Sequence, residues 1–305
     1  MELSDRFDPS ILRNVYINKN SVDSQVKQII RNTPVAYDME WLLKAVTVID
    51  LTTLSGDDTK SNVRRLCLKA AKPLPDALLK KLEVEDQILR TAAVCVYPSR
   101  IKDAYSTIHH MGLSKEILIA SVATGFPSGL YPIDSRLDEI KAAISNGATE
   151  IDIVVDRSLI LTGEWETLFD ELQLMKTACG NAHMKVILGV GELGCYENVY
   201  KASMVAMYAG ADFIKTSTGK ETVNATLPVG LIMCRAIRHF YQQTRIKVGL
   251  KAAGGIKTAE DAINWLVLVY NELGAEWLTP KLFRIGASSL VDNIENYFLN
   301  EIWKW

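Results

Sequence analysis

Eight short β-rich runs alternate with amphipathic helical stretches along this chain, and this alternation constrains its fold more than any other feature. Strands that alternate with helices are typical of parallel βαβ units, whereas closely spaced strands would indicate a sandwich. The predicted strands are Thr47–Thr52, Ala92–Tyr97, Ile117–Ala123, Glu150–Val155, Lys185–Gly189, Asp212–Thr216, Ile246–Lys251 and Phe283–Gly286. Eight β/α units in one continuous chain predict an α/β fold, a closed (β/α)₈ or TIM barrel.

The domain organisation follows from the same pattern. No low-complexity linker or block of like charge divides the alternation, so residues 1–305 are predicted to form a single barrel domain. Residues 1–46 precede the first predicted strand and contain helix-like pieces such as SVDSQVKQIIRN. They predict an N-terminal helical extension that covers the bottom or the flank of the barrel.

Composition excludes several functional classes. A net charge of -2 argues against a nucleic-acid binder, which normally carries a basic field. No apolar run approaches the ~20 residues that span a bilayer, and the N-terminal MELSDRFDPS lacks the features of a secretory signal. The five cysteines are scattered without a CxxC pair, which is typical of free thiols in a reducing compartment. We therefore expect a cytoplasmic protein that binds neither nucleic acid nor membrane.

Strand periodicity predicts which side chains point into the barrel. In EIDIVVD the apolar Ile151 and Ile153 share the face that should meet the helices, so the acidic face that includes Asp152 points inward. The same alternation brings four charged side chains to one barrel interior: Asp50, Asp152, Lys215 and Lys251. They lie near the C-terminal strand ends, where barrel enzymes carry their chemistry.

These four charges permit two interpretations, a buried ion-pair network that supports the barrel or a reactive amine. A lysine is nucleophilic only when neutral, and lowering its pKa from ~10.4 to ~7 requires roughly 4–5 kcal/mol. A second ammonium ~6 Å away supplies about 2–3 kcal/mol at an effective dielectric of 20, and partial desolvation supplies the remainder. Because their strands are neighbours, Lys251 is predicted to be the second cation beside a Schiff-base-forming Lys215. Asp152 is then the predicted proton relay.

A metal-dependent reaction would need histidine or carboxylate ligands at the strand tips. His109, His110 and His239 lie in predicted helices, and His183 precedes a strand at the barrel bottom. We therefore expect no metal and no other cofactor.

Three segments of small residues follow the last three predicted strands, and they suggest a phosphate site. They are TSTGK (Thr216–Lys220), AGG (Ala253–Gly255) and GASSL (Gly286–Leu290). Glycine lets backbone amides approach an anion, and barrels often bind phosphate after strands seven and eight. Lys220 adds a positive charge, and Ser288 and Ser289 add hydroxyl donors. The alternative is that these residues only form turns and helix caps.

At these residues the sequence closely resembles the deoxyribose-phosphate aldolase family of class I aldolases. The matching blocks, in order, are IDLTTL, AAVCVYP, VATGFPSG, EIDIVV, DFIKTSTGK, KAAGGIKT and RIGASSL. The resemblance implies an aldehyde-lyase of deoxyribonucleotide and carbohydrate catabolism. It would reversibly cleave 2-deoxy-D-ribose 5-phosphate to acetaldehyde and D-glyceraldehyde 3-phosphate. It also implies a homodimer.

The resemblance assigns roles residue by residue. Lys215 matches the Schiff-base lysine, Lys251 the perturbing lysine and Asp152 the proton-relay aspartate. The matching substrate or phosphate positions are Asp50, Cys95, Thr218, Lys220, Gly254, Gly255, Ser288 and Ser289. A buried cysteine on a strand is most often a packing residue, and we favour that interpretation of Cys95.

Three positions depart from the family pattern. Ala252 stands where the family usually has proline, and Val190 where it tends to have threonine. Family members often end in a tail with a tyrosine that assists proton transfer, whereas this chain ends in NEIWKW, and we do not assign that role to Tyr297. Two other functions stay open: a barrel isomerase or aldolase for another phosphorylated sugar, and a phosphosugar-binding protein without turnover.

Overall fold

The computed structural model describes residues 7–32 and 38–302, so the expectations for MELSDRFDPS and for the C-terminal tail extend outside the described residues. The strands are β1 Ile49–Thr52, β2 Ala93–Val96, β3 Leu118–Ala123, β4 Glu150–Val154, β5 His183–Ile187, β6 Phe213–Lys215, β7 Gly249–Ala253 and β8 Phe283–Ala287. The helices are α1 Lys19–Arg31, α2 Asp38–Thr47, α3 Lys60–Ala71, α4 Asp76–Lys81, α5 Ile101–His110, α6 Ile133–Ser145, α7 Arg157–Thr162, α8 Trp165–Cys179, α9 Tyr196–Tyr208, α10 Leu227–Thr244, α11 Ala259–Leu273 and α12 Leu290–Ile302. Short 3₁₀ turns occur at Pro9–Leu12, Pro98–Arg100, Val190–Glu192 and Ala275–Trp277.

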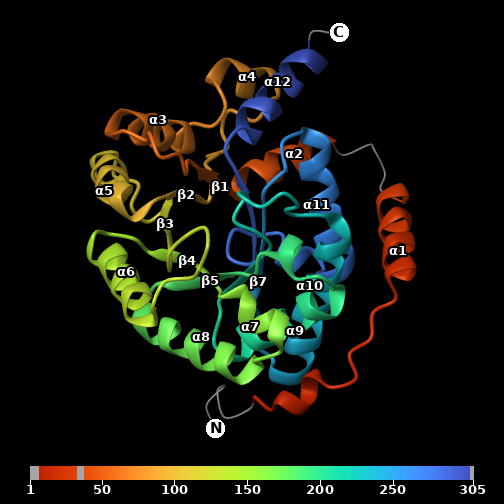
Figure 1. The fold of residues 1–305 in the computed structure, drawn as a ribbon. Coiled ribbons are helices and arrows are strands. Elements are labelled where there is room, and N and C mark those ends of the chain that lie inside the picture. Colours follow the sequence, from red (N-terminus) through yellow and green to blue (C-terminus); the bar gives the residue numbers. More distant parts are fainter. Residues whose placement is uncertain (1–6, 33–37, 303–305) are drawn as a thin grey trace.

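The eight strands form one closed parallel barrel. Each strand pairs with the next along the chain, and β8 closes the barrel on β1. The helices surround the strands as an outer ring (Figure 1). The predicted TIM barrel with helices before its first strand is therefore confirmed.

Two predicted strands are displaced along the sequence. β5 begins at His183 rather than Lys185, because the backbone N–H of His183 already bonds to the carbonyl of Thr149. β7 begins at Gly249 rather than Ile246, because residues from Ile246 follow directly on the left-handed C-cap of α10 at Arg245. Pairing with β6 starts only where Gly249 lies opposite Phe213.

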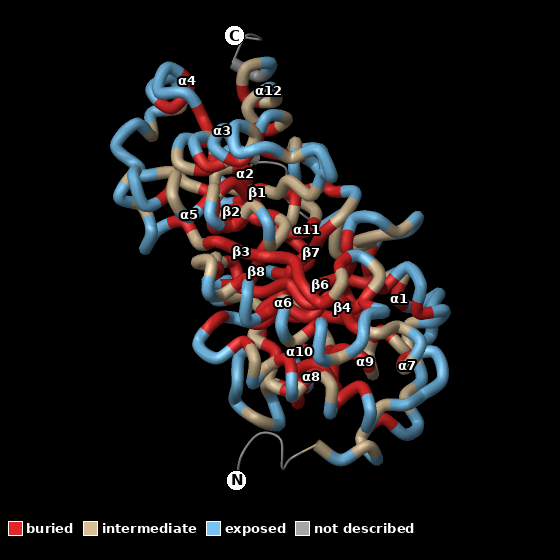
Figure 2. Tube along the Cα trace, turned by 60° about the vertical axis from the view of Figure 1, so that its left-hand side comes forward, coloured by how far each residue is buried: buried red, intermediate tan, exposed pale blue. Residues whose placement is uncertain are grey.

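Burial follows the two layers of the fold. The strands are buried apart from a few residues such as His183 at the start of β5, while the helices are buried on the side that faces the strands and exposed on the other (Figure 2). Local signals fix the helix starts, as at α11, where Thr258 and Asp261 form a reciprocal capping box. The barrel is thus a rigid frame from which the βα loops project.

The N-terminal extension lies on the flank of the barrel. α1 packs on the outer side of α10 and α11 (Figure 1), and α2 packs against α11 and α12. The ring of Phe7 stacks on Phe169 of α8 with centroids 4.4 Å apart. The sequence predicted that the extension covers either the bottom or the flank of the barrel, and its described residues lie on the flank.

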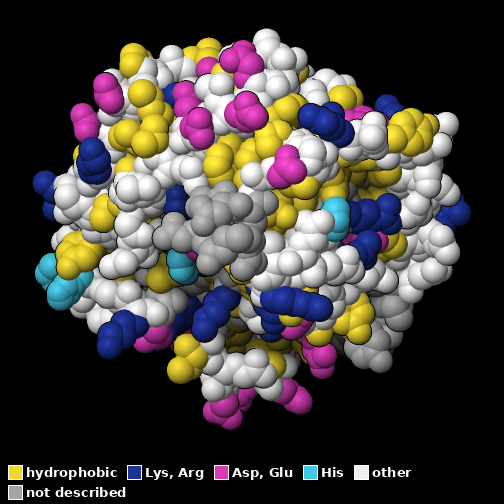
Figure 3. Space-filling model, turned by 90° about the horizontal axis from the view of Figure 1, so that it is seen from below, with side chains coloured by type: hydrophobic (Ala, Val, Ile, Leu, Met, Phe, Trp, Pro, Cys, Tyr) yellow, Lys and Arg dark blue, Asp and Glu magenta, His cyan; other side chains and the backbone are white. Residues whose placement is uncertain are grey.

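The outer surface carries no concentrated charge on the face that Figure 3 presents. Lysine, arginine and acidic side chains are interspersed there, with hydrophobic side chains between them. Within the described part of the chain, no helix has the length and apolar character needed to cross a membrane.

Candidate active site

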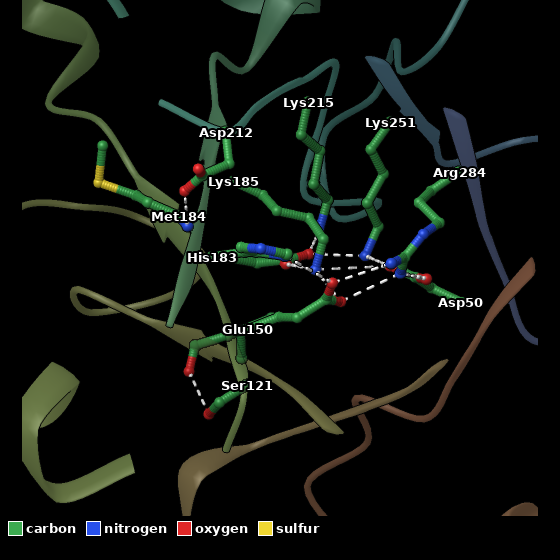
Figure 4. Close-up of polar contacts among 12 residues, drawn as sticks. Asp50, Ser121, Glu150, His183, Met184, Lys185, Asp212, Lys215, Lys251 and Arg284 are labelled. Atoms are coloured by element: carbon green, nitrogen blue, oxygen red, sulfur yellow. Dashed lines mark hydrogen bonds and ion pairs between the residues drawn. The ribbon is translucent and has the colours of Figure 1, made fainter. Parts of the chain in front are cut away.

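Seven charged side chains fill the interior of the barrel, each at most 2% exposed. They are Asp50 on β1, Glu150 and Asp152 on β4, Lys185 on β5, Lys215 on β6, Lys251 on β7 and Arg284 on β8. They belong to one connected set of ion pairs, and Figure 4 labels six of them where they converge: Asp50, Glu150, Lys185, Lys215, Lys251 and Arg284. The four charges predicted to point inward therefore do so, and three more accompany them.

In the upper part of this set, two amines share one carboxylate oxygen. Lys215 Nζ lies 2.8 Å from Asp152 Oδ2, and Lys251 Nζ lies 2.7 Å from the same atom. The two nitrogens are therefore no further apart than the sum of these distances, 5.5 Å. Lys251 also pairs with Asp50 Oδ2 at 2.5 Å.

In the lower part, Glu150 joins two cations. Arg284 holds both oxygens of Glu150, through Nη2 at 2.8 Å and Nη1 at 3.0 Å, and Nη1 also contacts Asp50 Oδ1 at 2.6 Å. Lys185 Nζ lies 2.5 Å from Glu150 Oε2 and 3.1 Å from Asp152 Oδ1. Lys185 thus links the lower part of the set to the carboxylate that holds Lys215.

The charges in this interior do not balance when every group is ionised. Three carboxylates face four basic groups, so one base is in excess. Arginine keeps its proton under all ordinary conditions, whereas a buried lysine readily gives its proton up. The set is neutral when a single lysine is uncharged.

The local environment selects Lys215 as that lysine. Burial lowers the pKa of Lys215, and the nearby Lys251 ammonium lowers it further, although Asp152 opposes both effects. Burial also disfavours charge on Lys251, but the carboxylates of Asp152 and Asp50 outweigh it, so the pKa of Lys251 is raised. Burial therefore lowers the pKa of Lys215 more than the Lys251 ammonium does. From the sequence, the larger contribution was expected from the second cation.

Asp152 remains ionised in this arrangement. Burial raises the pKa of its carboxyl, but the three surrounding lysines lower it well below its ordinary value. The site therefore places an amine with a lowered pKa and an amine with a raised pKa within hydrogen-bond distance of one carboxylate. Such a group can attack a carbonyl and transfer protons beside it.

A cavity of about 380 Å³ opens above the two amines at the C-terminal mouth of the barrel. Its lining includes Lys215, Lys251, Thr218, Gly219, Lys220, Gly254, Gly255, Lys257, Ser288 and Ser289. All three small-residue segments predicted to form a phosphate site thus meet at this cavity. The loop after β1 completes the wall with Thr52–Ser55.

The backbone at Gly254 requires glycine. Gly254 adopts φ +88°, and a Cβ there would lie 2.6 Å from the side chain of Asn224. Gly255 adopts φ +87° and has no such neighbour within 4 Å. This pair of residues leaves the amide groups after β7 uncovered on the side of the cavity.

Lys220 and Thr218 take part in loop contacts at the mouth. Lys220 Nζ donates a hydrogen bond to the carbonyl of Leu54, 3.0 Å away on the opposite loop. The backbone N–H of Thr218 donates to the carboxylate of Glu221 at 3.0 Å, and its hydroxyl bonds to the same group at 2.6 Å. Lys220 therefore crosses the mouth rather than pointing at the loops after β7 and β8.

Asp50 and Cys95 do not line this cavity. Asp50 lies beneath Lys251 and is held between that lysine and Arg284. Cys95 is fully buried and belongs to a second apolar cluster with Val122, Phe126 and neighbouring residues. Burial raises the pKa of its thiol.

Two of the departures from the family pattern, Ala252 and Val190, also lie away from the cavity lining, and the third, the C-terminal tail, extends outside the described residues. Ala252 is a buried residue of β7 on the face opposite Lys251, and Val190 belongs to the main apolar core. Tyr297 lies in α12, packed against that core.

Sequence reasoning missed Lys185, Arg284 and Lys257. The strand alternation that placed Lys251 inward applies equally to Lys185 and Arg284, so the signal was present in HMKVI and FRIGA. Lys257 follows directly on the AGG segment and could have been recognised as a second cation beside the predicted phosphate site.

A second cavity, of about 880 Å³, lies at the opposite end of the barrel. Its lining includes His183, Phe213 and Arg284 and shares no residue with the mouth cavity. The ring of Phe213 occupies the interior space beside Gly249, where a Cβ would lie only 2.3 Å from the ring. Phe213 thus lies beneath the ion-pair set, with the Arg284 guanidinium carbon 5.5 Å from its ring centroid.

No group of three or more metal-binding side chains is arranged to hold a metal ion within residues 7–32 and 38–302.

Comparisons with known proteins identify the family to which this chain belongs. The profile of the DeoC/LacD family of aldolases matches residues 44–292. The chain is 56% identical over 297 residues to deoxyribose-phosphate aldolase of Mus musculus and 54% identical to that of Homo sapiens, and each match covers 97% of this chain and 93% of the relative. The deoxyribose phosphate aldolase from Aeropyrum pernix, described as a tetramer, has a similar fold, with TM-score 0.61 and 23% identity over 87% of this chain and 98% of that one. This chain belongs to the DeoC/LacD family of aldolases.

Proposed function

We propose that this protein is a deoxyribose-phosphate aldolase, an aldehyde-lyase that reversibly cleaves 2-deoxy-D-ribose 5-phosphate to acetaldehyde and D-glyceraldehyde 3-phosphate. The observation that carries this proposal is the buried Lys215 amine beneath the mouth cavity, which shares one Asp152 oxygen with Lys251. The names of relatives with 53–56% identity support the substrate.

The reaction begins at the neutral Lys215 amine. Its nitrogen attacks the C1 aldehyde of the open-chain sugar, and loss of one water leaves a protonated Schiff base. The Lys251 ammonium, on the other side of Asp152 Oδ2, supplies the proton that the departing hydroxyl needs. Lys215 is the only amine of the set that lines the mouth cavity and also has a lowered pKa.

The Schiff base then draws electrons from the neighbouring carbon–carbon bond. The C3 hydroxyl loses its proton through Asp152, the C2–C3 bond breaks, and its electron pair forms an enamine between C2 and C1. The C3 fragment leaves as glyceraldehyde 3-phosphate. Protonation at C2 and addition of one water release acetaldehyde and restore the amine.

The phosphate of the substrate is proposed to bind where the loops after β7 and β8 meet. Gly254 and Gly255 offer backbone amides there, Ser288 and Ser289 offer hydroxyls, and Lys257 offers a positive charge. Thr218 and Lys220 line the β6 side of the same cavity, within reach of the sugar hydroxyls or the phosphate. Binding energy from the phosphate fixes the position of C1 against Lys215.

The proposal is tested by acetaldehyde release and by borohydride trapping with acetaldehyde. We expect one reduced two-carbon adduct on Lys215, and at least a 10⁴-fold loss of cleavage in Lys215→Ala, since the covalent route is removed. Lys141→Ala, which removes an exposed lysine of α6, is the matched control. An adduct that persists in Lys215→Ala would reject the assignment.

Two further outcomes would replace the proposed activity. Faster cleavage of ribose 5-phosphate than of the 2-deoxy sugar would indicate an aldolase for another phosphorylated sugar. Tight binding of the 2-deoxy sugar phosphate without acetaldehyde release would indicate a binding protein.

We also propose that residues 1–305 form one domain, that the protein is a homodimer and that it is cytoplasmic. α1 packs on the barrel helices, which supports a single domain. All five cysteines are free, which suits a reducing compartment. Sedimentation would test the dimer, limited proteolysis the single domain and cell fractionation the location.

A further inference from the structure

We propose that Arg284 is a positioning residue for this reaction, because it supplies the cation that leaves Lys215 as the excess, uncharged base of the barrel interior. The inference rests on the proposed Schiff-base role of Lys215. Arg284 is 2% exposed on β8 and contacts neither Lys215 nor the mouth cavity. Its ion pairs are with Asp50 and Glu150, so it acts on Lys215 through the carboxylates, while its Nε donates to the carbonyl of Pro280.

The barrel interior holds one more basic group than carboxylates. Three carboxylates can neutralise three cations, and Arg284, Lys185 and Lys251 are those three. Each of them contacts at least two carboxylates, whereas within the described residues Asp152 is the one carboxylate that Lys215 contacts. Lys215 is therefore the cation whose loss leaves the most ion pairs intact.

Replacement of Arg284 by a neutral residue would change this balance of charges. Three carboxylates would then face only two fixed cations, and the interior would take up one proton. Lysine amines are far stronger bases than carboxylates, with ordinary pKa values of ~10.4 against ~4. The proton would therefore go to Lys215 rather than to Asp50 or Glu150.

The groups that face Lys215 come from every strand that contributes a titratable side chain within the described residues. They are Asp50 on β1, Cys95 on β2, Glu150 and Asp152 on β4, Lys185 on β5, Lys251 on β7 and Arg284 on β8. His183, at the lower end, lies 3.6 Å from Glu150 and has a side chain that is 54% exposed. It is the solvent-exposed neighbour of Glu150, and it is therefore given its own control variant.

The experiment measures the rate of borohydride-trapped adduct formation with acetaldehyde across pH. In the wild type this rate should rise with pH as Lys215 loses its proton. In Arg284→Met the rise should move about one pH unit to the alkaline side, with about tenfold slower trapping below the midpoint and an unchanged plateau. Arg284→Lys keeps the charge and should keep the wild-type midpoint.

Two matched variants separate this effect from general damage. Arg136→Met removes another buried arginine, which is 4% exposed and pairs with Glu171 on the outer helices, and it should not move the midpoint. His183→Gln should not move the midpoint either. A lower plateau with an unmoved midpoint in Arg284→Met would mean a purely structural role and would overturn the proposal.

Glu150→Gln provides the opposite test. It removes a carboxylate, leaves three cations against two, and should move the midpoint to the acid side by about one unit. The double variant Arg284→Met/Glu150→Gln restores the balance and should return the midpoint to the wild-type position. If Arg284→Met does not fold, an unmoved midpoint in Glu150→Gln is sufficient to overturn the proposal. Absence of any Lys215 adduct in the wild type would instead reject the proposed function.

Discussion

The upper and lower parts of the barrel interior use the same kinds of side chain but pair them differently. In the lower part, both oxygens of Glu150 are held by Arg284, and Lys185 adds a third contact. In the upper part, two amines share the single Oδ2 atom of Asp152. When Asp50 is counted with its partner Arg284, the lower part has two carboxylates for the two cations Arg284 and Lys185. The upper part then has the single carboxylate of Asp152 for two amines, one more base than it can neutralise.

This difference shows how a buried ion-pair network and a reactive amine can be the same structure. From the sequence, these two were alternatives. In the structure, the pairs of Glu150 with Arg284 and Lys185 hold the charges of the lower part in place. The two amines on Asp152, next to the cavity, include the base that can lose its proton. Buried pairs alone are weak evidence for stability or for catalysis. Here the imbalance of charge, and not the presence of charge, marks the reactive end.

The largest expected effect comes from comparing the loss of one carboxylate from the upper part of the interior with the loss of one from the lower part. Asp152→Asn should lower kcat about 10³-fold, because it removes the proton relay and the shared acceptor of both amines. Glu150→Gln, its partner on the same strand, should keep kcat within about tenfold while costing about 3 kcal/mol of unfolding free energy. Steady-state kinetics and urea unfolding of both variants check this, and equal losses of kcat would break the comparison.

Lys251→Met should reduce cleavage at neutral pH about 10²-fold. It removes the ammonium that lies within 5.5 Å of Lys215 Nζ, so the Lys215 amine is protonated to a higher pH. The pH–rate profile should recover part of the loss at alkaline pH. Lys247→Met, which removes an exposed lysine paired with Glu276, is the control. A loss that is the same at every pH would contradict the electrostatic role.

Gly254→Ala should raise KM for the phosphorylated sugar about tenfold, because the new methyl group meets Asn224 and the backbone φ is unfavourable for alanine. Gly112→Ala, at φ +71° with no neighbour within 4 Å, imposes similar backbone strain away from the site. Comparison with unphosphorylated 2-deoxyribose sharpens the test. A KM that rises equally for both sugars would argue against a phosphate site at Gly254.

The smallest expected effect is on stability. Lys215→Met should increase the unfolding free energy at pH 7 by about 1 kcal/mol, because a lysine whose pKa is lowered by burial destabilises the folded state. The unfolded chain binds more protons than the folded one between the two pKa values of Lys215. Wild-type stability should therefore rise with pH in that window, and the difference from Lys215→Met should shrink. Thermal unfolding at pH 7 and pH 9 measures this, and a constant difference would contradict it.

Much of the site could be predicted because a strand has a period of two. Asp152, Lys215 and Lys251 alternate with apolar residues, and chain order makes β6 and β7 neighbours, so convergence of these side chains followed from the sequence.

Strand alternation also points Lys185 and Arg284 inward, but it does not show that their side chains reach the carboxylates of the site. Lys185 stands first in the predicted strand Lys185–Gly189, although β5 begins two residues earlier, and Arg284 lies second in β8. Both looked remote from the mouth. Their side chains are long enough to cross the ~3.3 Å rise of one or two residues and reach the carboxylates. Side-chain reach, like the contact of Lys220 with Leu54, depends on packing that a linear pattern does not contain.

The aromatic ring beside Gly249 has a consequence for the course of the reaction. Phe213 fills the interior below the charged set, the two cavities share no lining residue, and Lys215 lines only the cavity at the C-terminal mouth. We therefore expect solvent to reach a covalent intermediate on Lys215 along the path by which the aldehydes enter and leave. A nucleophilic carbon formed there is exposed on one side, so a bond made to it, whether to a hydrogen or to an incoming aldehyde, should have a single handedness.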